Sequence, residues 1–306
     1  MTIEEIKQAL GQCFWIGFDG LELPPTMKTF ISSNHIGGVT LFSNNYQSPA
    51  QVAELINSIQ SLSPNLPLAI CVDHEGGKVQ RFKNGFTKIP EANILSQQNS
   101  PKFAFDCAKL IAEELVAVGV NINFSPVADI NTNPSNPVIG NRSFGDNEAV
   151  VTKMVSAFVR GFLTHKLQCV VKHFPGHGDT TKDSHFHLPK VQTSRDTLFE
   201  RELKPFQKAF RSHCELVMMA HIIVESIDPG LPATLSKKIV TDLLRNELRF
   251  KGIVITDDME MKAIADHFGK DEAPFKALQA GCDVLLYHTE AFETAAYEGL
   301  MSKLSS

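Results

Sequence analysis

One stretch of the sequence, residues 172–187, concentrates side chains that are able to transfer protons and bind polar ligands. It holds four of the chain's eleven histidines, together with Lys172 and Asp183. A proline and two glycines interrupt it, and such residues allow a sharp turn and a close approach of other groups to the backbone. A loop exposed to water does not require this mixture of side chains. We therefore interpret the stretch as a functional site rather than as a polar loop.

Two further segments place an acidic side chain directly after an apolar run of strand length. Asp73 is followed by a Gly-Gly turn and by Arg81, and Asp257 follows the apolar run 252–256. A carboxylate at position 73 can accept hydrogen bonds from sugar hydroxyls, and an arginine donates to several oxygens in a fixed geometry. A carboxylate at position 257 can act as a nucleophile. The alternative for this segment is a helix N-cap, for which Asp258 is the better candidate.

Strand-length apolar runs and amphipathic helical patterns alternate along the whole chain. The apolar runs are residues 13–18, 36–42, 68–72, 120–124, 169–171, 216–220, 252–256 and 282–287. The helical patterns are residues 1–10, 103–118, 148–165, 195–211, 237–247, 271–280 and 291–304, with Ser236 as an N-cap and Gly281 as a C-terminal stop. Continuous apolar runs are typical of parallel strands that are covered on both faces.

This alternation predicts an α/β fold, a (β/α)8 TIM-type barrel that forms a single domain over residues 1–306. A doubly wound open sheet is the alternative fold, but no glycine-rich nucleotide-binding motif follows any of the strands. Active sites of such barrels lie at the C-terminal ends of the strands. The polar residues predicted at those ends are Asp19, Asp73, His74, Glu75, Asp129, Lys172, His173, His221, Asp257, Asp258 and His288.

Composition excludes several classes of function. The net charge of −5 and the isoelectric point near 6.1 do not favour a nucleic acid or an anionic membrane as a partner. No apolar run approaches the ~18 residues of a membrane span, and residues 1–10 lack the apolar core of a signal peptide. The six cysteines are scattered and form no CxxC motif, which speaks against zinc and disulfide frameworks and fits a reducing cytoplasm. Nothing marks an oligomer interface, so we expect a monomer.

Taken together, the site residues suit glycoside hydrolysis. Hydrolysis with retention requires a nucleophile on one face of the sugar and a proton donor near the leaving oxygen. The best donor in this sequence is His185, because the unperturbed histidine pKa of ~6.5 already lies near neutral pH. Asp183 lies two residues before it and could hold its imidazole in one tautomer.

These motifs resemble those of glycoside hydrolase family 3, in particular its single-domain bacterial β-N-acetylhexosaminidases. The matching residues are the Asp73–Gly77 segment with Arg81, the loop 141–145 with Arg142, the stretch 172–185 and Thr256-Asp257-Asp258. The resemblance spans most of the barrel. One departure is His74, where many relatives have glutamine.

The resemblance implies specific roles and an activity. Asp257 would be the nucleophile, and His185 would be the acid/base in a dyad with Asp183. The terminal N-acetylglucosamine would be bound by Asp73, Arg81, Arg142, Lys172 and His173. The enzyme would remove this sugar from peptidoglycan fragments during cell-wall recycling in the cytoplasm, without a metal or another cofactor. Many family 3 glucosidases take their acid/base carboxylate from a second domain, whereas this sequence ends with the barrel and would use its own loop.

Two other interpretations remain open from the residues. A metal-dependent hydrolase is suggested by His185-x-His187 together with His173 and His221. That HxH motif, however, follows a central strand rather than the first one. A sugar-binding barrel without turnover is the second alternative, and the joint presence of Asp257, Asp183 and His185 speaks against it.

Overall fold

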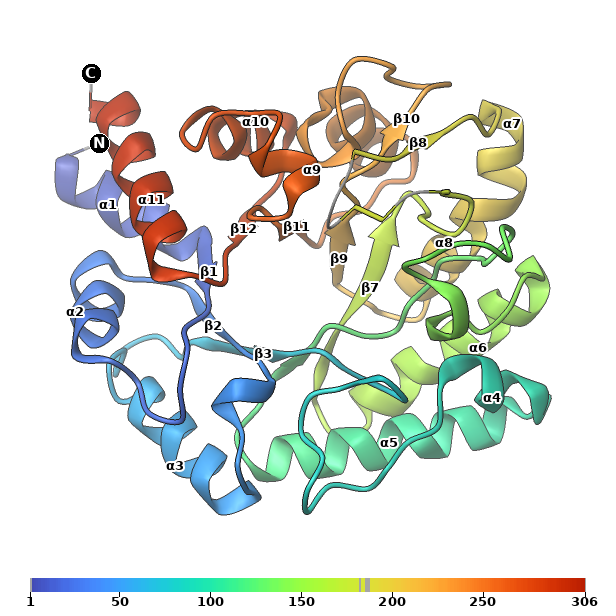
Figure 1. Ribbon diagram of the computed structural model, residues 1–306, viewed down its shortest axis with the longest axis horizontal. Coiled ribbons are helices and arrows are strands. Elements are labelled where there is room, and N and C mark those ends of the chain that lie inside the picture. Colours follow the sequence, from blue (N-terminus) through green and yellow to red (C-terminus); the bar gives the residue numbers. More distant parts are fainter. Residues whose placement is uncertain (1, 182, 185–187, 306) are drawn as a thin grey trace.

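The protein folds as a closed barrel of eight parallel strands surrounded by helices (Figure 1). The computed structural model describes residues 2–181, 183–184 and 188–305. Each barrel strand pairs with the next one along the chain, and the last strand pairs with the first. The predicted (β/α)8 barrel is therefore confirmed. Among the described residues, no helix is both long and apolar enough to cross a membrane.

All eight predicted strands are present in the barrel. They are β1 (Phe14–Ile16), β2 (Gly38–Leu41), β3 (Ala69–Val72), β6 (Ile122–Asn123), β7 (Gln168–Phe174), β9 (Leu216–Met219), β11 (Ile253–Asp258) and β12 (Val284–Leu286). Two of them are longer than predicted: β7 continues to Phe174 and β11 continues to Asp258. Lys172, His173 and Asp257 therefore belong to strands rather than to the loops after them.

Helices follow the strands and cover the outside of the barrel (Figure 1). They are α1 (Ile3–Gln12), α2 (Pro25–Asn34), α3 (Pro49–Gln60), α4 (Ala92–Gln97), α5 (Pro101–Ala117), α6 (Glu148–Leu163), α7 (Arg195–Thr197), the π-helical η3 (Leu198–Glu202), α8 (Leu203–Arg211), the π-helical η5 (Lys238–Glu247), α9 (Lys262–Ala265), α10 (Glu272–Ala280) and α11 (Glu290–Ser305). The predicted helix 195–211 is thus divided by η3, while α2, α3, α4 and α9 are additional to the predicted set.

The predicted signals lie at helix ends, although the N-cap of η5 is Lys237, one residue after Ser236. The hydroxyl of Ser236 accepts a hydrogen bond from the Ile239 amide at 3.3 Å, at the start of η5. Gly281 ends α10 in the left-handed conformation, with φ of 111°, which a glycine adopts without steric cost.

The alternation of side chains along the strands divides the core into two parts. In β1, Phe14 and Ile16 face the surrounding helices, whereas Trp15 belongs to a separate cluster contributed by the other strands. That inner cluster fills the barrel, as expected for residues spaced two apart. Its rings include Trp15 and Phe124, which stack with their centroids 6.4 Å apart. The barrel interior is therefore a packed core, and an open site must lie at one of its ends.

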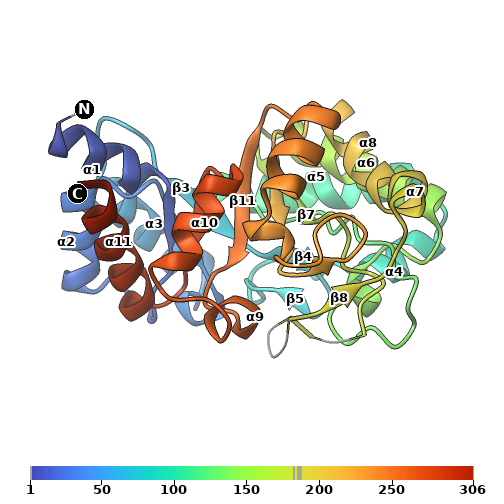
Figure 2. The same ribbon diagram turned by 90° about the horizontal axis from the view of Figure 1, so that it is seen from above.

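Loops with two small sheets gather at one end of the barrel (Figure 2). One sheet pairs β4 (His74–Gly76) with β5 (Val79–Gln80), and the other pairs β8 (Lys190–Val191) with β10 (Ile223–Val224). These strands follow the C-terminal ends of barrel strands. Val79 of β5 lines the cavity described below.

The contact between α5 and α6 depends on a glycine, and it offers a test of the packing. A Cβ atom added to Gly161 would lie 2.6 Å from both the Phe105 carbonyl oxygen and the Ala108 Cβ. We expect Gly161→Ala to destabilise the protein by ~1–3 kcal/mol, because the clash exceeds the gain in helix propensity of about 1 kcal/mol. Urea denaturation measures the change. Gly230→Ala is the control, since its nearest neighbouring atom would be 3.9 Å away. Equal midpoints for the two variants would contradict this account of the packing.

Candidate active site

A cavity of about 240 Å³ lies at the C-terminal ends of the strands. Six of the residues predicted for the site line it together, namely Asp73, Arg81, Arg142, Lys172, His173 and Asp257. Phe124, Met218 and Leu286, which belong to the barrel or its inner cluster, also line it and form an apolar base. Ionisable groups above an apolar base are typical of sites for small polar ligands.

The predicted dyad is only partly described. Asp183 is half-buried and directly precedes Ser184, which lines the cavity. His185 lies outside the described residues, as does His187 of the HxH motif. Asp19, another predicted strand-end residue, is exposed and is not part of the cavity lining.

Backbone irregularities occur where the site residues leave their strands. The pairing of β7 with β9 shifts register at Lys172 and His173. The pairing of β11 with β12 shifts register at Asp257. Such irregularities redirect side chains and are common beside active sites.

Lys172 is the centre of a cluster of buried charges. Its Nζ lies 2.6 Å from Asp73 Oδ1 and 2.6 Å from Glu75 Oε1. Arg142, at the end of the 3-10 helix η2 (Gly140–Arg142), binds Glu75 through Nε at 3.0 Å and Nη2 at 2.7 Å. Arg81 reaches Asp73 Oδ2 at 3.3 Å. Three cations therefore surround two carboxylates, and the cluster carries a net positive charge.

The cations keep both carboxylates ionised despite their burial. Burial alone would raise the pKa of Asp73, but Lys172 and Arg81 bring that pKa well below its usual value. Burial also opposes ionisation of Glu75, whose pKa is lowered by Arg142 and Lys172. Asp73 therefore remains a hydrogen-bond acceptor facing the cavity. Glu75 was predicted at a strand end but not as a site residue. Its carboxylate binds Lys172 and Arg142.

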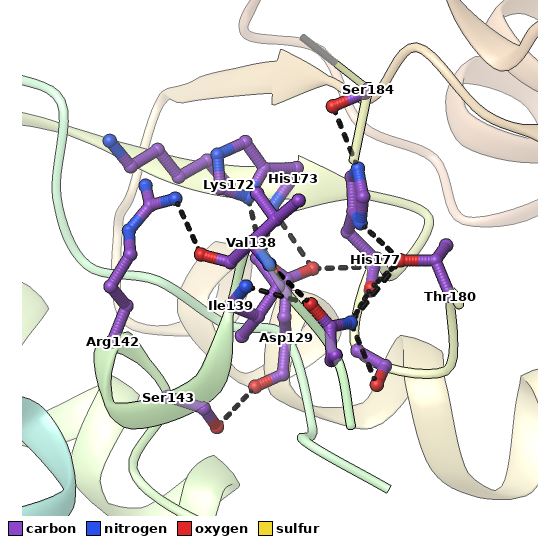
Figure 3. Close-up of polar contacts among 12 residues, drawn as sticks. Asp129, Val138, Ile139, Arg142, Ser143, Lys172, His173, His177, Thr180 and Ser184 are labelled. Carbon is purple, nitrogen blue, oxygen red and sulfur yellow. Dashed lines mark hydrogen bonds and ion pairs between the residues drawn. The ribbon is translucent and has the colours of Figure 1, made fainter. Parts of the chain in front are cut away.

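Asp129 connects His173 with the loop that follows β7 (Figure 3). One carboxylate oxygen lies 2.6 Å from His173 Nδ1, and the other accepts from the His177 amide at 2.7 Å. Its backbone carbonyl accepts from the Ser143 hydroxyl at 2.6 Å. Burial would raise the pKa of Asp129, but His173 and His177 lower it below its usual value. Asp129 was not among the predicted site residues. Its predicted position at a strand end was the one feature of the sequence that pointed to a role in the site.

Asp257 projects from the end of β11 beside Lys172 and two histidines, His173 and His221. Burial would raise the pKa of Asp257, yet His173, His221, the Asp258 amide and Lys172 lower it below its usual value. The Asp258 amide donates to Asp257 Oδ1 at 2.8 Å. This carboxylate is therefore ionised at neutral pH and faces the cavity, as a nucleophile requires.

The proposed helix cap at Asp258 is wrong. The strand continues through Asp258, and α9 begins only at Lys262, after Met261 as N-cap. Asp258 instead accepts from the Glu260 amide at 3.0 Å and approaches His288 Nδ1 at 2.5 Å. The extension of β11 into the barrel rim thus overrode the local preference of an aspartate for capping.

Among the described residues, Asp258, Glu260 and His288 have possible metal-ligand atoms within 4.8 Å of one another. Glu260 already accepts from the His288 and Thr289 amides, each at 2.7 Å. Its carboxylate therefore fixes the turn before α11. His173 and His221, which suggested a metal site in the sequence, do not belong to this group. His221 instead contacts the Asp258 carbonyl oxygen through Nε2 at 2.9 Å.

Comparisons with known proteins agree with this arrangement. Residues 5–306 match the family described as the glycosyl hydrolase family 3 N terminal domain. Beta-hexosaminidase A of Pseudoalteromonas piscicida is 38% identical over 284 residues, which cover 86% of this chain and 48% of the relative. The chain thus spans about half the length of that relative.

Two solved structures share the fold closely. A family 3 beta-N-acetylglucosaminidase from Paenibacillus sp. str. FPU-7 superposes with a TM-score of 0.96 and 41% identity, over 98% of this chain and 58% of that one. NagZ from Neisseria gonorrhoeae, in complex with N-trifluoroacetyl-D-glucosamine, superposes with a TM-score of 0.85 and 32% identity, over 95% of this chain and 84% of that one. From the matched range and these identities, the chain belongs to glycosyl hydrolase family 3 and contains the N-terminal barrel domain of that family.

Proposed function

We propose that this chain is a retaining β-N-acetylhexosaminidase that removes terminal N-acetylglucosamine, and that residues 1–306 form one catalytic barrel domain. The observation that carries the proposal is the ionised Asp257 in a cavity whose other wall is the Lys172 charge cluster. The relatives named beta-hexosaminidase and beta-N-acetylglucosaminidase support N-acetylglucosamine as the sugar that is removed. The N-trifluoroacetyl-D-glucosamine in the NagZ complex supports the same sugar.

The cavity has a size and polarity that suit one sugar ring. Its volume of about 240 Å³ lies just below the range of roughly 300–1,000 Å³ for ligand pockets, so it suits a single small unit. In the proposed complex, Asp73 accepts hydrogen bonds from sugar hydroxyls. The oxygens of the sugar accept hydrogen bonds from Arg81, Arg142, Lys172 and His173. The ion pairs within the cluster hold these groups in place before the substrate arrives.

In the proposed mechanism, Asp257 attacks the anomeric carbon while His185 protonates the leaving oxygen. The carbon–oxygen bond to the leaving group breaks as the bond to Asp257 forms, which gives a covalent glycosyl-enzyme. His185 then takes a proton from water, and the resulting hydroxide equivalent releases the sugar with its original configuration. Asp183 would stabilise the protonated form of His185.

We also propose peptidoglycan fragments as the natural substrate and the cytoplasm as the location, with the protein acting as a monomer and without a nucleic acid or membrane partner. The support for the substrate is the resemblance to bacterial β-N-acetylhexosaminidases. The support for the location is that all six cysteines are free thiols, including Cys169 and Cys214, whose sulfurs lie 3.7 Å apart without a disulfide bond.

The proposed activity predicts retention and a label on Asp257. A chromogenic aryl N-acetyl-β-glucosaminide should be hydrolysed, and NMR should show the β-anomer as first product. A 5-fluoro glycoside should modify Asp257, as mass spectrometry of the peptide would show. Asp257→Asn should abolish turnover. The control Asp258→Asn should still be labelled on Asp257. An initial α-anomer, or a label on Asp258, would disprove the assignment.

Chelation serves as a control for this activity. We expect hydrolysis to survive prolonged EDTA treatment, since none of the proposed steps uses a metal. Loss of activity that added zinc restores would instead favour the metal-dependent hydrolase.

The dyad predicts a shift in the pH profile. Asp257 stays ionised above roughly pH 4, since its pKa is lowered from an ordinary value of about 3.9, so it does not limit activity near neutrality. The loss of rate on the alkaline side should therefore report deprotonation of His185. Asp183→Ala removes a negative charge that favours the imidazolium, so that limb should move to lower pH and the rate at pH 7 should fall. An unmoved profile of kcat/KM would exclude the dyad.

The natural substrate can be tested separately. Incubation with a muropeptide that carries a terminal N-acetylglucosamine should release the free sugar, detected by mass spectrometry. We expect no release from the same muropeptide lacking that sugar. Efficient cleavage of the aryl glycoside with none of the muropeptide would disprove the proposed role in recycling.

A further inference from the structure

His177 is buried at the centre of the loop after β7, and both nitrogens of its ring have partners. Nδ1 lies 2.9 Å from the Thr180 hydroxyl, and Nε2 lies 3.0 Å from the Ser184 hydroxyl (Figure 3). Only 1% of the surface of His177 is exposed, and Ser184 is equally buried. A ring held at both ends fixes the separation between two points of the loop.

The surrounding hydrogen bonds define how the ring is oriented. Burial, followed by the charge of His173, lowers the pKa of His177 to about 4, so the ring is neutral and carries one N–H. The Thr180 hydroxyl donates to the His177 carbonyl oxygen at 3.0 Å and therefore accepts from Nδ1–H. Nε2 is then left to accept from the Ser184 hydroxyl. Ser184 thus donates its single hydroxyl proton to His177.

The same residue is anchored to the sugar-binding side of the cavity. The His177 amide donates to Asp129 Oδ1 at 2.7 Å, while the other oxygen of that carboxylate lies 2.6 Å from His173 Nδ1. Asn136 adds a further anchor, since its side-chain amide donates to the His177 carbonyl oxygen at 2.8 Å. His173 and the loop are therefore positioned by one buried carboxylate.

Ser184 also contacts the side of the site that carries the proposed nucleophile. Its backbone carbonyl accepts from the amide of Ala263 in α9 at 3.3 Å, and α9 follows the strand that ends in Asp257 and Asp258. Ser184 is therefore joined to His177 by its side chain and to α9 by its backbone. Ser184 lies directly beside Asp183 in the chain, so its position constrains where Asp183 can lie.

We propose that His177 is a positioning residue for the acid/base dyad: through Ser184 it holds the adjoining segment at a fixed distance from Asp129 and His173. This inference rests on the proposed function, because it assumes that the segment delivers a proton. The proton donor must lie within hydrogen-bond reach of the leaving oxygen. A displacement of about 1 Å in such a group can lower the rate by roughly 100-fold.

The kinetic test uses Ser184→Ala, which removes only the hydroxyl, and His177→Gln, which alters the ring. Both should lower kcat/KM by about 10–100-fold for an alkyl glycoside, whose poor leaving group requires protonation. Both should change it less than threefold for a dinitrophenyl glycoside, which leaves without full protonation. Thr181→Ala is the matched control, because Thr181 lies in the same loop and is exposed. An equal loss on both substrates, or no loss, would overturn the positioning role.

A second measurement does not depend on turnover. Hydrogen exchange of the Ala263 amide should be at least tenfold faster in Ser184→Ala and in His177→Gln than in wild type, with Thr181→Ala unchanged. Unchanged exchange of the Ala263 amide in both variants would also overturn the proposal. If His177→Gln fails to fold, unchanged exchange in Ser184→Ala alone would overturn it. If wild type hydrolyses no aryl N-acetylglucosaminide, the proposed function fails, and exchange still decides whether His177 holds Ser184.

Discussion

The buried ammonium group of Lys172 is the charge on which the arrangement of the site depends. Its side chain is only 2% exposed, and an unpaired charge in such a position costs several kcal/mol. Asp73 and Glu75 neutralise it at 2.6 Å each. These carboxylates in turn require Arg81 and Arg142. Because each residue of the cluster forms an ion pair with a neighbour, the removal of one partner leaves another buried charge unpaired.

The strand that carries Lys172 also carries the second network. The next residue, His173, is held by Asp129, whose carboxylate extends the network to His177 and the loop beyond. The charge cluster and this hydrogen-bond network therefore meet at one point of β7, where the pairing with β9 is irregular. The end of β7 consequently orients both the groups proposed to bind the sugar and the loop that follows. Groups held on rigid elements need little rearrangement when the substrate binds.

Asp257 and Asp258 show how the environment separates two identical neighbours. Asp257 faces His173, His221 and Lys172, which hold it ionised in the cavity. Asp258 lies beside His288 and fixes the turn after the strand. The chemical difference therefore comes from the charges that face each side chain and not from the residue type. The Asp258 carboxylate lies 2.5 Å from His288 Nδ1, whereas Asp257 lines the cavity and accepts from the Asp258 amide.

Sequence alone determined the barrel and most of the ionisable side chains that line the cavity. Eight continuous apolar runs, separated by helical patterns, are sufficient to predict a parallel barrel, because strands covered on both faces must be apolar throughout. Closure of the barrel then brings the C-terminal ends together, so Asp73, Lys172 and Asp257 were predicted to meet, and they line one cavity. Arg81 and Arg142 were identified from the motifs around them, and both line the same cavity.

Only the tertiary structure decided what each polar group contacts. Glu75 binds Lys172, which lies 97 positions later in the sequence (172 − 75). Asp129 binds His173, which lies 44 positions later (173 − 129). Asp258 was predicted as a helix cap, a local preference that lost to the extension of β11 into the rim. Hydrophobic periodicity records which face of an element is buried. It carries no information on which buried charges will neutralise one another, because that depends on distances set when the barrel closes.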